Sequence, residues 1–230
     1  MGTKNVKNTM IERLLKIVAP HPCLECGKLG NMLCECCAYN IDNEPFYGCM
    51  VCFLPTSSGV CPQHTVDVEA SWIVGWRRET LERLINAYKF ERKQNASYTL
   101  ASLLSRRIPQ LPADTVVVPV PTRPAHVRQR GYDHSLLLAR RFSALRGLEV
   151  SGAIATRAKR AQHFSDKKQR LDQAQQAFYP TGPFDPTRPH LIIDDIVTTG
   201  ATVSGMTDIL RQAGVQTIWL GALARQPLDE

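Results

Sequence analysis

The chain has 230 residues, of which 43% are hydrophobic and 21% charged, and its formal net charge is +7 at pH 7. This composition argues against global disorder and allows one sizeable core, alone or with a small additional module. The basic excess fits an anionic partner, either a phosphorylated small molecule or a nucleic acid, although a mildly basic surface without such a partner fits equally well.

Residues 1–22 form a leader. Its apolar residues recur at helical spacing and predict a short amphipathic helix that packs on the body of the protein. Charged residues interrupt this stretch, so it lacks the apolar segment of a signal peptide. No segment reaches the ~18 uninterrupted apolar residues of a membrane span. We therefore expect a cytoplasmic protein with no membrane span.

All the cysteines lie between Cys23 and Cys61. Because no export signal is visible, metal binding is favoured over disulfides. A gap of two residues lets a tight turn aim two side chains at one metal ion, and four pairs have this gap. Two tetrahedral zinc sites are therefore predicted in residues 23–64, where the metal supplies folding energy that so few large apolar residues cannot. The pairs are Cys23 and Cys26, Cys34 and Cys37, Cys49 and Cys52, and Cys61 and His64.

The simplest assignment of these pairs is sequential, with the first two pairs at one zinc ion and the last two at the other. Interleaved pairing stays open. Cys36 is left over and could replace Cys34 or Cys37 as a ligand. The second site ends in His64 and could be degenerate. The predicted zinc ribbon either contacts nucleic acid or caps the rest of the protein.

Residues 65–230 alternate strand-like and helix-like segments. This alternation predicts an α/β domain with a mainly parallel sheet. Residues 158–173 are polar and basic and read as a loop or an exposed helix. Strands are predicted over 71–76, 115–118, 148–154, 190–193 and 217–223, and helices over 80–90, 98–108, 133–145 and 203–213.

The segment that ends at Thr202 carries the clearest chemical signal. A hydrophobic strand leads to Asp194 and Asp195, then to a loop of small residues with three threonines, and then to a helix. Backbone N–H groups and hydroxyls at a helix N-terminus suit a phosphate, and acids at the carboxyl end of a strand suit sugar hydroxyls. The alternative is an ordinary strand–turn–helix with an aspartate cap. The segment fits neither a Walker loop nor a dinucleotide-binding fingerprint.

This segment resembles the signature of type I phosphoribosyltransferases, which binds phosphoribosyl pyrophosphate (PRPP). Further segments resemble the ComF/GntX family of competence-associated and DNA-utilisation proteins, and the resemblance covers nearly the whole chain. They are Lys89–Phe90, Val118–Arg123, Arg128–Ser135, and Gln162 with Arg170. The family's usual Arg-Gly-Phe-Asn-Gln stands here as Arg130-Gly131-Tyr132-Asp133-His134. The Asn that commonly lies shortly after the arginine at position 170 is also missing.

The resemblance implies a type I phosphoribosyltransferase fold with an N-terminal double zinc ribbon, divided into residues 1–22, 23–64 and 65–230. It also implies that Asp194 and Asp195 hold the ribose hydroxyls and act in catalysis. Magnesium travels with PRPP, because the pyrophosphate carries dense negative charge. The implied phosphate contacts are Thr198, Thr199, Gly200, Ala201 and Thr202, and the implied pyrophosphate loop is Pro121, Thr122 and Arg123. Arg128 and Arg130 either contact phosphate or lie on the surface.

Three functions stay open. The first is a phosphoribosyltransferase with an unknown acceptor, such as a nucleobase or an amine in salvage. The second is a competence or DNA-utilisation protein that binds PRPP or a nucleotide and whose ribbon binds single-stranded DNA. The third is a PRPP sensor without turnover. A homodimer is expected from the resemblance. The basic stretch over 157–170 either closes over substrate, lies against DNA or is solvated. The candidate proton carriers are His126, His134 and His163, although lone histidines are more often structural or on the surface.

Overall fold

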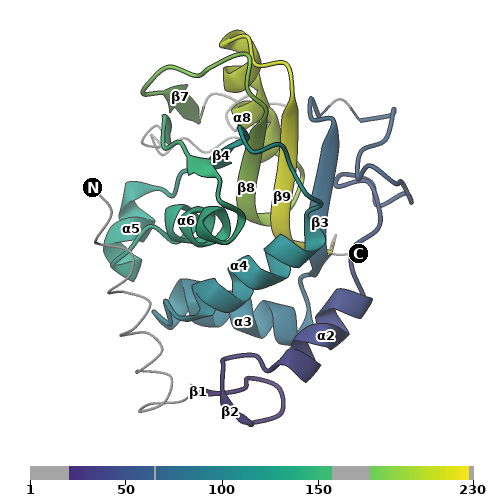
Figure 1. Ribbon diagram of the computed structural model, residues 1–230, viewed down its shortest axis with the longest axis vertical. Helices are drawn as coiled ribbons and strands as arrows, with labels where there is room; N and C mark the ends of the chain where they lie inside the picture. Colours follow the sequence, from purple (N-terminus) through teal and green to yellow (C-terminus); the bar gives the residue numbers. More distant parts are fainter. Residues whose placement is uncertain (1–20, 65, 157–176, 228–230) are drawn as a thin grey trace, which may run out of the picture.

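A five-stranded parallel sheet forms the centre of the protein (Figure 1). The computed structural model describes residues 21–64, 66–156 and 177–227. The predicted α/β fold with a mainly parallel sheet is confirmed, because helices connect the parallel strands. The strands stand in the order β3 (Ala70–Trp76), β9 (Ile218–Arg225), β8 (His190–Val197), β4 (Val116–Pro119) and β5 (Glu149–Val150).

Helices cover both faces of the sheet, because its buried strands send apolar side chains to each face in turn. Leu191 and Ile193 of β8 belong to one apolar cluster, and Ile192 between them belongs to the other. Figure 1 shows the first layer in front of the sheet and the second behind it. The front layer is α3 (Glu79–Phe90), α4 (Ala96–Arg107) and α6 (His134–Arg146), and the back layer is α8 (Ala201–Gln212).

The predicted helices correspond to α3, α4, α6 and α8, but some boundaries differ. The predicted strand over 148–154 is confirmed only at β5 and is otherwise too long. The chain leaves the sheet after Val150, and β6 (Ile154–Thr156) pairs antiparallel with β7 (Phe178–Pro180) instead. The predicted strand over 190–193 is too short, because β8 continues through both acids. The sequence pattern does not predict α2 (Glu35–Asn43) or α5 (Pro124–Arg130), and the leader helix and residues 158–173 lie outside the described residues.

The cysteine-rich module packs on the sheet through both apolar clusters. Besides α2 it contains β2 (Leu29–Gly30), which pairs antiparallel with β1 (His21–Pro22) just before the first cysteine. Leu33 joins the cluster of α3 and α4, and Met50 joins the cluster of α8. The division of the chain at residue 64 stays a prediction, since the two parts share their cores. None of the helices within the described ranges has the length and apolarity needed to cross a bilayer.

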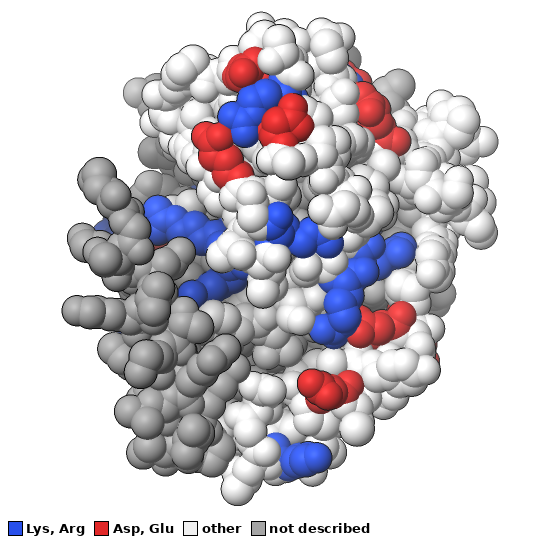
Figure 2. Space-filling view, viewed as in Figure 1, with Lys and Arg blue, Asp and Glu red and all other residues white. Residues whose placement is uncertain are grey.

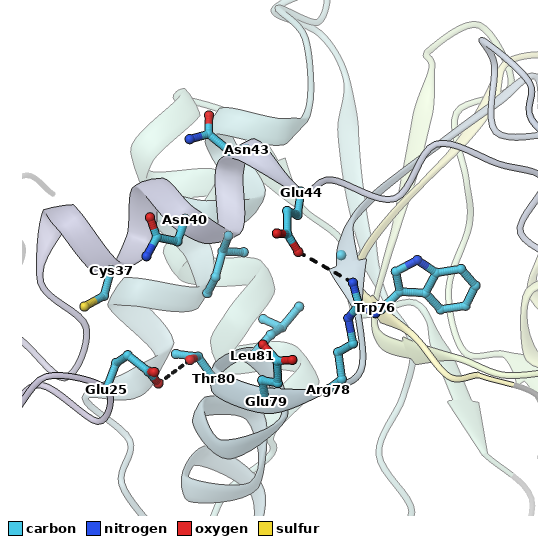
Figure 3. A pocket seen from close by; sticks show the side chains of 12 residues that line it. Glu25, Cys37, Asn40, Asn43, Glu44, Trp76, Arg78, Glu79, Thr80 and Leu81 are labelled. Carbon is cyan, nitrogen blue, oxygen red and sulfur yellow. Dashed lines mark hydrogen bonds and ion pairs between the residues drawn. The ribbon is translucent and has the colours of Figure 1, made fainter.

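A groove of about 400 Å³ marks the seam between α2 and the start of α3 (Figure 3). Glu44 and Arg78 form an ion pair of 3.5 Å across it. Thr80 at the start of α3 donates a hydrogen bond to Glu25 of the module. The residues that line the groove include none of the residues predicted to bind PRPP. The groove therefore lies where the cysteine-rich module meets the rest of the chain, and it is separate from the candidate site.

Candidate functional site

The carboxyl ends of the parallel strands bring the predicted site residues to one edge of the sheet. Val197 at the end of β8 stands in register with Arg225 at the end of β9, and the phosphate loop follows Val197 directly. On the other side, the N–H of Val120, just after β4, donates to the carbonyl of Ile193 at 2.9 Å. Residues 121–123 therefore begin beside the strand that carries both acids, where open parallel sheets bind ligands.

Asp195 is the centre of a buried charged network. Its Oδ2 lies 2.7 Å from Nε2 of His134 and 3.0 Å from Nζ of Lys89. Lys89 is the most exposed of the three side chains, at 14%. Burial alone raises the pKa of Asp195, but the hydrogen bond from His134 and the charge of Lys89 outweigh burial and hold this pKa well below its ordinary value. Asp195 is therefore an anion throughout the physiological pH range.

His134 connects this anion to the loop after β4. Its Nδ1 lies 2.7 Å from a terminal nitrogen of Arg130 and 3.1 Å from the hydroxyl of Thr122. A guanidinium can only donate, so Nδ1 accepts and the ring proton sits on Nε2, which donates to Asp195. The imidazole thus forms a bridge between Arg130 and Asp195.

The start of α6 holds His134 in this orientation. Asp133 caps the helix, because its Oδ1 accepts from the N–H of Leu136 at 3.0 Å. The same oxygen accepts from the hydroxyl of Thr122 at 2.8 Å, which ties residues 121–123 to α6. The fully buried Tyr88 donates from its hydroxyl to the carbonyl of His134 at 2.6 Å. Tyr88 is thus a core residue.

The sequence pattern does not predict that Lys89 or His134 lies beside the acids expected to hold the ribose. They lie on α3 and α6, and only the packing of both helices on one face of the sheet brings them to Asp195. Two signals in the sequence pointed to them. Lys89 is part of a segment that resembles the family, and His134 stands where the family usually has glutamine.

Asp194 is buried beside Asp195 but has a different environment. Its Oδ1 accepts from the backbone N–H of Asp195 at 2.8 Å, and no side chain in the described part of the protein donates to it. Burial, together with the negative charge of Asp195, raises the pKa of Asp194 from 3.8 to about 7. The two acids therefore titrate far apart, and Asp194 takes up a proton near neutral pH.

Asp194→Asn is expected to stabilise the protein at pH 8 by ~1–4 kcal/mol and to stabilise it by less than half as much at pH 5. The folded protein keeps the Asp194 proton up to about pH 7, whereas the unfolded chain releases it near the ordinary value of 3.8. The wild type therefore loses stability as the pH rises from about 4 to 7, a loss that asparagine avoids. Urea unfolding of both proteins at the two pH values, with metal saturating, measures the difference. An equal difference at both values contradicts the raised pKa.

The phosphate loop is open to solvent at the N-terminus of α8. Thr198 and Thr199 are exposed, and Gly200 adopts φ +81°, a left-handed conformation that favours glycine. Ala201 and Thr202 begin the helix and are half-buried. The first N–H groups of a helix have no partner within it and carry the positive end of the helix dipole, so this loop suits an anion.

The arginines expected at the pyrophosphate differ in exposure. Arg130 is buried and lies 5.3 Å from the ring centroid of Phe90. Arg123 and Arg128 are exposed, and no described acid pairs with either. Helix α5 carries Arg128 and Arg130 and ends at Gly131, whose φ of +83° turns the chain toward α6. The structure therefore places one arginine inside the Asp195 network and leaves two open to a ligand.

The predicted metal ligands form two sets of four, and the ligand atoms of each set lie within 4.8 Å of one another. The first cluster is Cys23, Cys26, Cys34 and Cys37, and the second cluster is Cys49, Cys52, Cys61 and His64. The sulfurs of Cys26 and Cys34 are 3.7 Å apart, as are those of Cys52 and Cys61. A tetrahedral zinc ion with Zn–S bonds of about 2.3 Å has S–S edges of about 3.8 Å. Each cluster could therefore hold one tetrahedral metal ion.

This grouping follows the sequential assignment. Cys36 is exposed and belongs to neither cluster, so the structure does not place it as a ligand in exchange for Cys34 or Cys37. His64 completes the second cluster, with Nδ1 3.2 Å from the sulfur of Cys61. Backbone N–H groups also donate to cluster sulfurs, as Cys34 does to Cys23 at 3.4 Å. The second cluster is thus complete in the number of its ligands.

Comparison with known proteins gives several relatives, although no family model matches the chain. Competence protein F from Haemophilus influenzae is 31% identical over 224 residues, which cover 88% of this chain and 96% of that protein. DNA utilization protein YhgH from Escherichia coli K12 is 31% identical over 153 residues, which cover 63% of this chain and 67% of that protein. Competence protein ComFC from Streptococcus pneumoniae is 25% identical over 207 residues, which cover 88% and 87%.

Two solved structures are similar to part of the chain. A hypoxanthine phosphoribosyltransferase from Staphylococcus aureus has a TM-score of 0.35 and 14% identity, with 61% of this chain and 75% of that chain covered. An allosteric regulatory enzyme of purine biosynthesis has a TM-score of 0.40 and 16% identity, with 56% and 25% covered.

The parallel sheet, the paired acids at its carboxyl edge and the two cysteine clusters define an α/β protein with an N-terminal cysteine-rich module that could hold two metal ions. The chain belongs to the ComF/GntX family, because it is 31% identical to Competence protein F over almost the whole of that protein.

Proposed function

We propose that the carboxyl edge of the sheet binds PRPP together with magnesium. The observation that carries this proposal is the buried anion Asp195, which Lys89 and His134 hold just before a loop that opens a helix N-terminus. Magnesium supplies positive charge to the pyrophosphate oxygens. The proposed contacts are Asp194 and Asp195 with the ribose, Thr198, Thr199, Gly200, Ala201 and Thr202 with the 5-phosphate, and Pro121, Thr122, Arg123, Arg128 and Arg130 with the pyrophosphate.

The names of the relatives support a role in DNA uptake or in the use of DNA as a nutrient. In such a role the site either transfers the phosphoribosyl group or senses PRPP without turnover. Transfer displaces pyrophosphate from the anomeric carbon through a cation-like ribosyl group, which nearby acids stabilise. A nucleobase or an amine as acceptor makes the reaction one of salvage. The expected homodimer stays a prediction.

Each cysteine cluster, in this proposal, binds one zinc ion. Thiolate-rich tetrahedral sites favour zinc over harder divalent ions. Four protein ligands fill every position, so both ions are structural and neither takes part in chemistry. The proposed division of the chain is residues 1–22 as leader, 23–64 as double zinc ribbon and 65–230 as phosphoribosyltransferase-like domain.

A second candidate function is the binding of single-stranded DNA. Tyr39 and Tyr47 in the module are 64% and 68% exposed, and the guanidinium of Arg107 lies 4.7 Å from the ring centroid of Tyr47. Figure 2 shows Lys and Arg side chains gathered in a band across the middle of one face, over α6 and α4. Exposed aromatic rings near cations are the features on which bases of single strands stack.

Thermal unfolding tests the primary proposal. PRPP with magnesium, at a concentration ~1,000-fold above its dissociation constant, is expected to stabilise the protein by about 4 kcal/mol. This corresponds to a rise in Tm on the order of 8–16 °C. Ribose 5-phosphate or pyrophosphate alone is expected to give a smaller rise, since each fills half of the site. Absence of any rise with PRPP contradicts the proposal.

The same samples separate the alternatives. Release of pyrophosphate with a base or an amine identifies a transferase, and stabilisation without product identifies a sensor. Salt-sensitive binding of single-stranded DNA that weakens in Cys26→Ser supports the second candidate function.

A further inference from the structure

Arg225, the last residue of β9, is a buried cation outside the proposed PRPP contacts. Its side chain is 0% exposed. It donates to the carbonyls of Met50 at 2.6 Å, Val51 at 3.3 Å, Val197 at 3.0 Å and Gln226 at 2.6 Å. These bonds occupy four of the five guanidinium N–H groups, so the side chain is held in one orientation.

The partners of Arg225 join two sites that are distant in the sequence. Met50 and Val51 lie between Cys49 and Cys52 of the second cluster. Val197 is the residue directly before the phosphate loop. Arg225 therefore links the turn that carries two metal ligands to the end of the strand that carries both acids.

The phosphate loop also rests on the second cluster. A Cβ atom added to Gly200 would lie 3.4 Å from Cγ2 of Val51 and 3.6 Å from Cγ2 of Val66. Val51 lies between two ligands of the second cluster, and Val66 follows His64 by two positions. The turn of the loop is thus supported by a surface whose shape depends on how the second cluster folds around its metal.

The charge of Arg225 also favours a link to the second cluster. No described carboxylate pairs with it, and an unpaired buried cation is strongly unfavourable. The ring of Phe53, with its centroid 4.4 Å from the guanidinium, offsets part of this cost. Three thiolates, a neutral imidazole and a divalent ion carry one net negative charge. Burial lowers the pKa of Arg225 to about 10.

We propose that Arg225 is a positioning residue that couples metal binding in the second cluster to the order of the phosphate loop. Loss of the second metal ion loosens residues 197–203 and weakens ligand binding, and a bound ligand raises the affinity for that ion, because such coupling is reciprocal. The part that concerns the ligand rests on the proposed PRPP site, and the part that concerns the loop does not.

The first cluster provides the matched control, because it packs on the opposite layer. Next to its ligands Cys23 and Cys26, Leu24 and Glu25 accept hydrogen bonds from Arg83 and Thr80 of α3. None of these contacts reaches the phosphate loop. Loss of the first metal ion is therefore expected to leave the loop unchanged.

Hydrogen–deuterium exchange of residues 197–203 in the zinc-loaded protein tests the coupling. Cys52→Ser is expected to speed exchange in this loop about 10-fold, and Cys26→Ser is expected to leave it unchanged. Unchanged loop exchange in Cys52→Ser overturns the proposal, as does equal loosening in the two variants.

Arg225→Met tests the link itself. On the Cys26→Ser background, which keeps only the second zinc ion, it is expected to lower the affinity for zinc about 10-fold in equilibrium competition with a chelator. PRPP with magnesium is expected to raise that affinity with Arg225 present and to have no effect with methionine there. A purely structural role would lower the zinc affinity of both clusters alike, which the same change in a Cys52→Ser background measures.

Two outcomes keep the test decisive. If Cys52→Ser and Arg225→Met fail to fold, Cys26→Ser alone tests the proposal. A chelator then removes the remaining zinc ion of this variant in steps. Exchange of residues 197–203 must rise with the fraction of zinc removed. If the loop responds to zinc but the wild type shows no response to PRPP, the proposed function fails and the coupling stands. Equal PRPP affinity in wild type and Cys52→Ser overturns the coupling and leaves the function intact.

Discussion

Asp195→Asn is expected to weaken the binding of PRPP with magnesium by at least ~100-fold. Asparagine keeps the shape of the side chain but removes the negative charge that orders the site. In the wild type this carboxylate holds both His134, at 2.7 Å, and Lys89, at 3.0 Å. Without it, the ribose hydroxyls lose a charged acceptor and the neighbouring cation is left unpaired. Calorimetric titration of PRPP into both proteins measures the loss.

The same substitution lowers stability, so binding and folding must be separated. Breaking a buried ion pair from one side costs about 3–5 kcal/mol, because Lys89, whose side chain is 14% exposed, loses its partner. A double variant with Lys89→Met removes both charges and is expected to regain most of the stability but none of the binding. Asp208→Asn, at an exposed acid on α8, is the matched control. PRPP affinity within about threefold of wild type in Asp195→Asn contradicts the proposed site.

Removal of the metal is expected to have the largest effect on stability. A structural zinc site contributes on the order of 10 kcal/mol, which equals or exceeds the whole stability of a typical domain. Leu33 and Met50 of the module are packed in the two apolar clusters of the sheet, so an unfolded module exposes part of both cores. Thermal unfolding before and after treatment with a strong chelator, with zinc counted by mass spectrometry, measures the effect.

Two cysteine variants give this experiment its controls. Cys36→Ser is expected to keep both zinc ions and full stability, because Cys36 is exposed and belongs to neither cluster. Cys26→Ser is expected to keep one zinc ion and to melt earlier. A protein whose melting is unchanged after its zinc has been withdrawn would show that the clusters do not hold the module together.

The sequence predicted the alternation of strands and helices because apolar periodicity follows local geometry. The strand after residue 190 was placed too short, because two adjacent acids read as the end of a buried strand. In the structure β8 continues to Val197, and the cost of burying Asp195 is offset by Lys89 and His134 from the front layer. Such compensation comes from tertiary packing and leaves no local pattern.

The two cysteine clusters were easier to predict from the sequence than the charged network around Asp195. Pairs of ligands with two residues between them carry their geometry in the spacing, so the sequential grouping could be proposed directly. Helix α5 escaped prediction because its seven residues are too few for an apolar period, although Pro124 at its first turn is a typical start. Arg225 also looked ordinary in the sequence, because its partners Met50 and Val197 come from two other parts of the chain.

A crystal structure of the zinc-loaded protein with PRPP and magnesium, with data collected at the zinc edge, tests the central claim most directly. We predict the 5-phosphate at residues 198–202, the ribose hydroxyls within hydrogen-bond distance of Asp194 and Asp195, and one anomalous peak in each cysteine cluster. Ligand bound elsewhere, with Asp195 still closed between Lys89 and His134, would contradict the account.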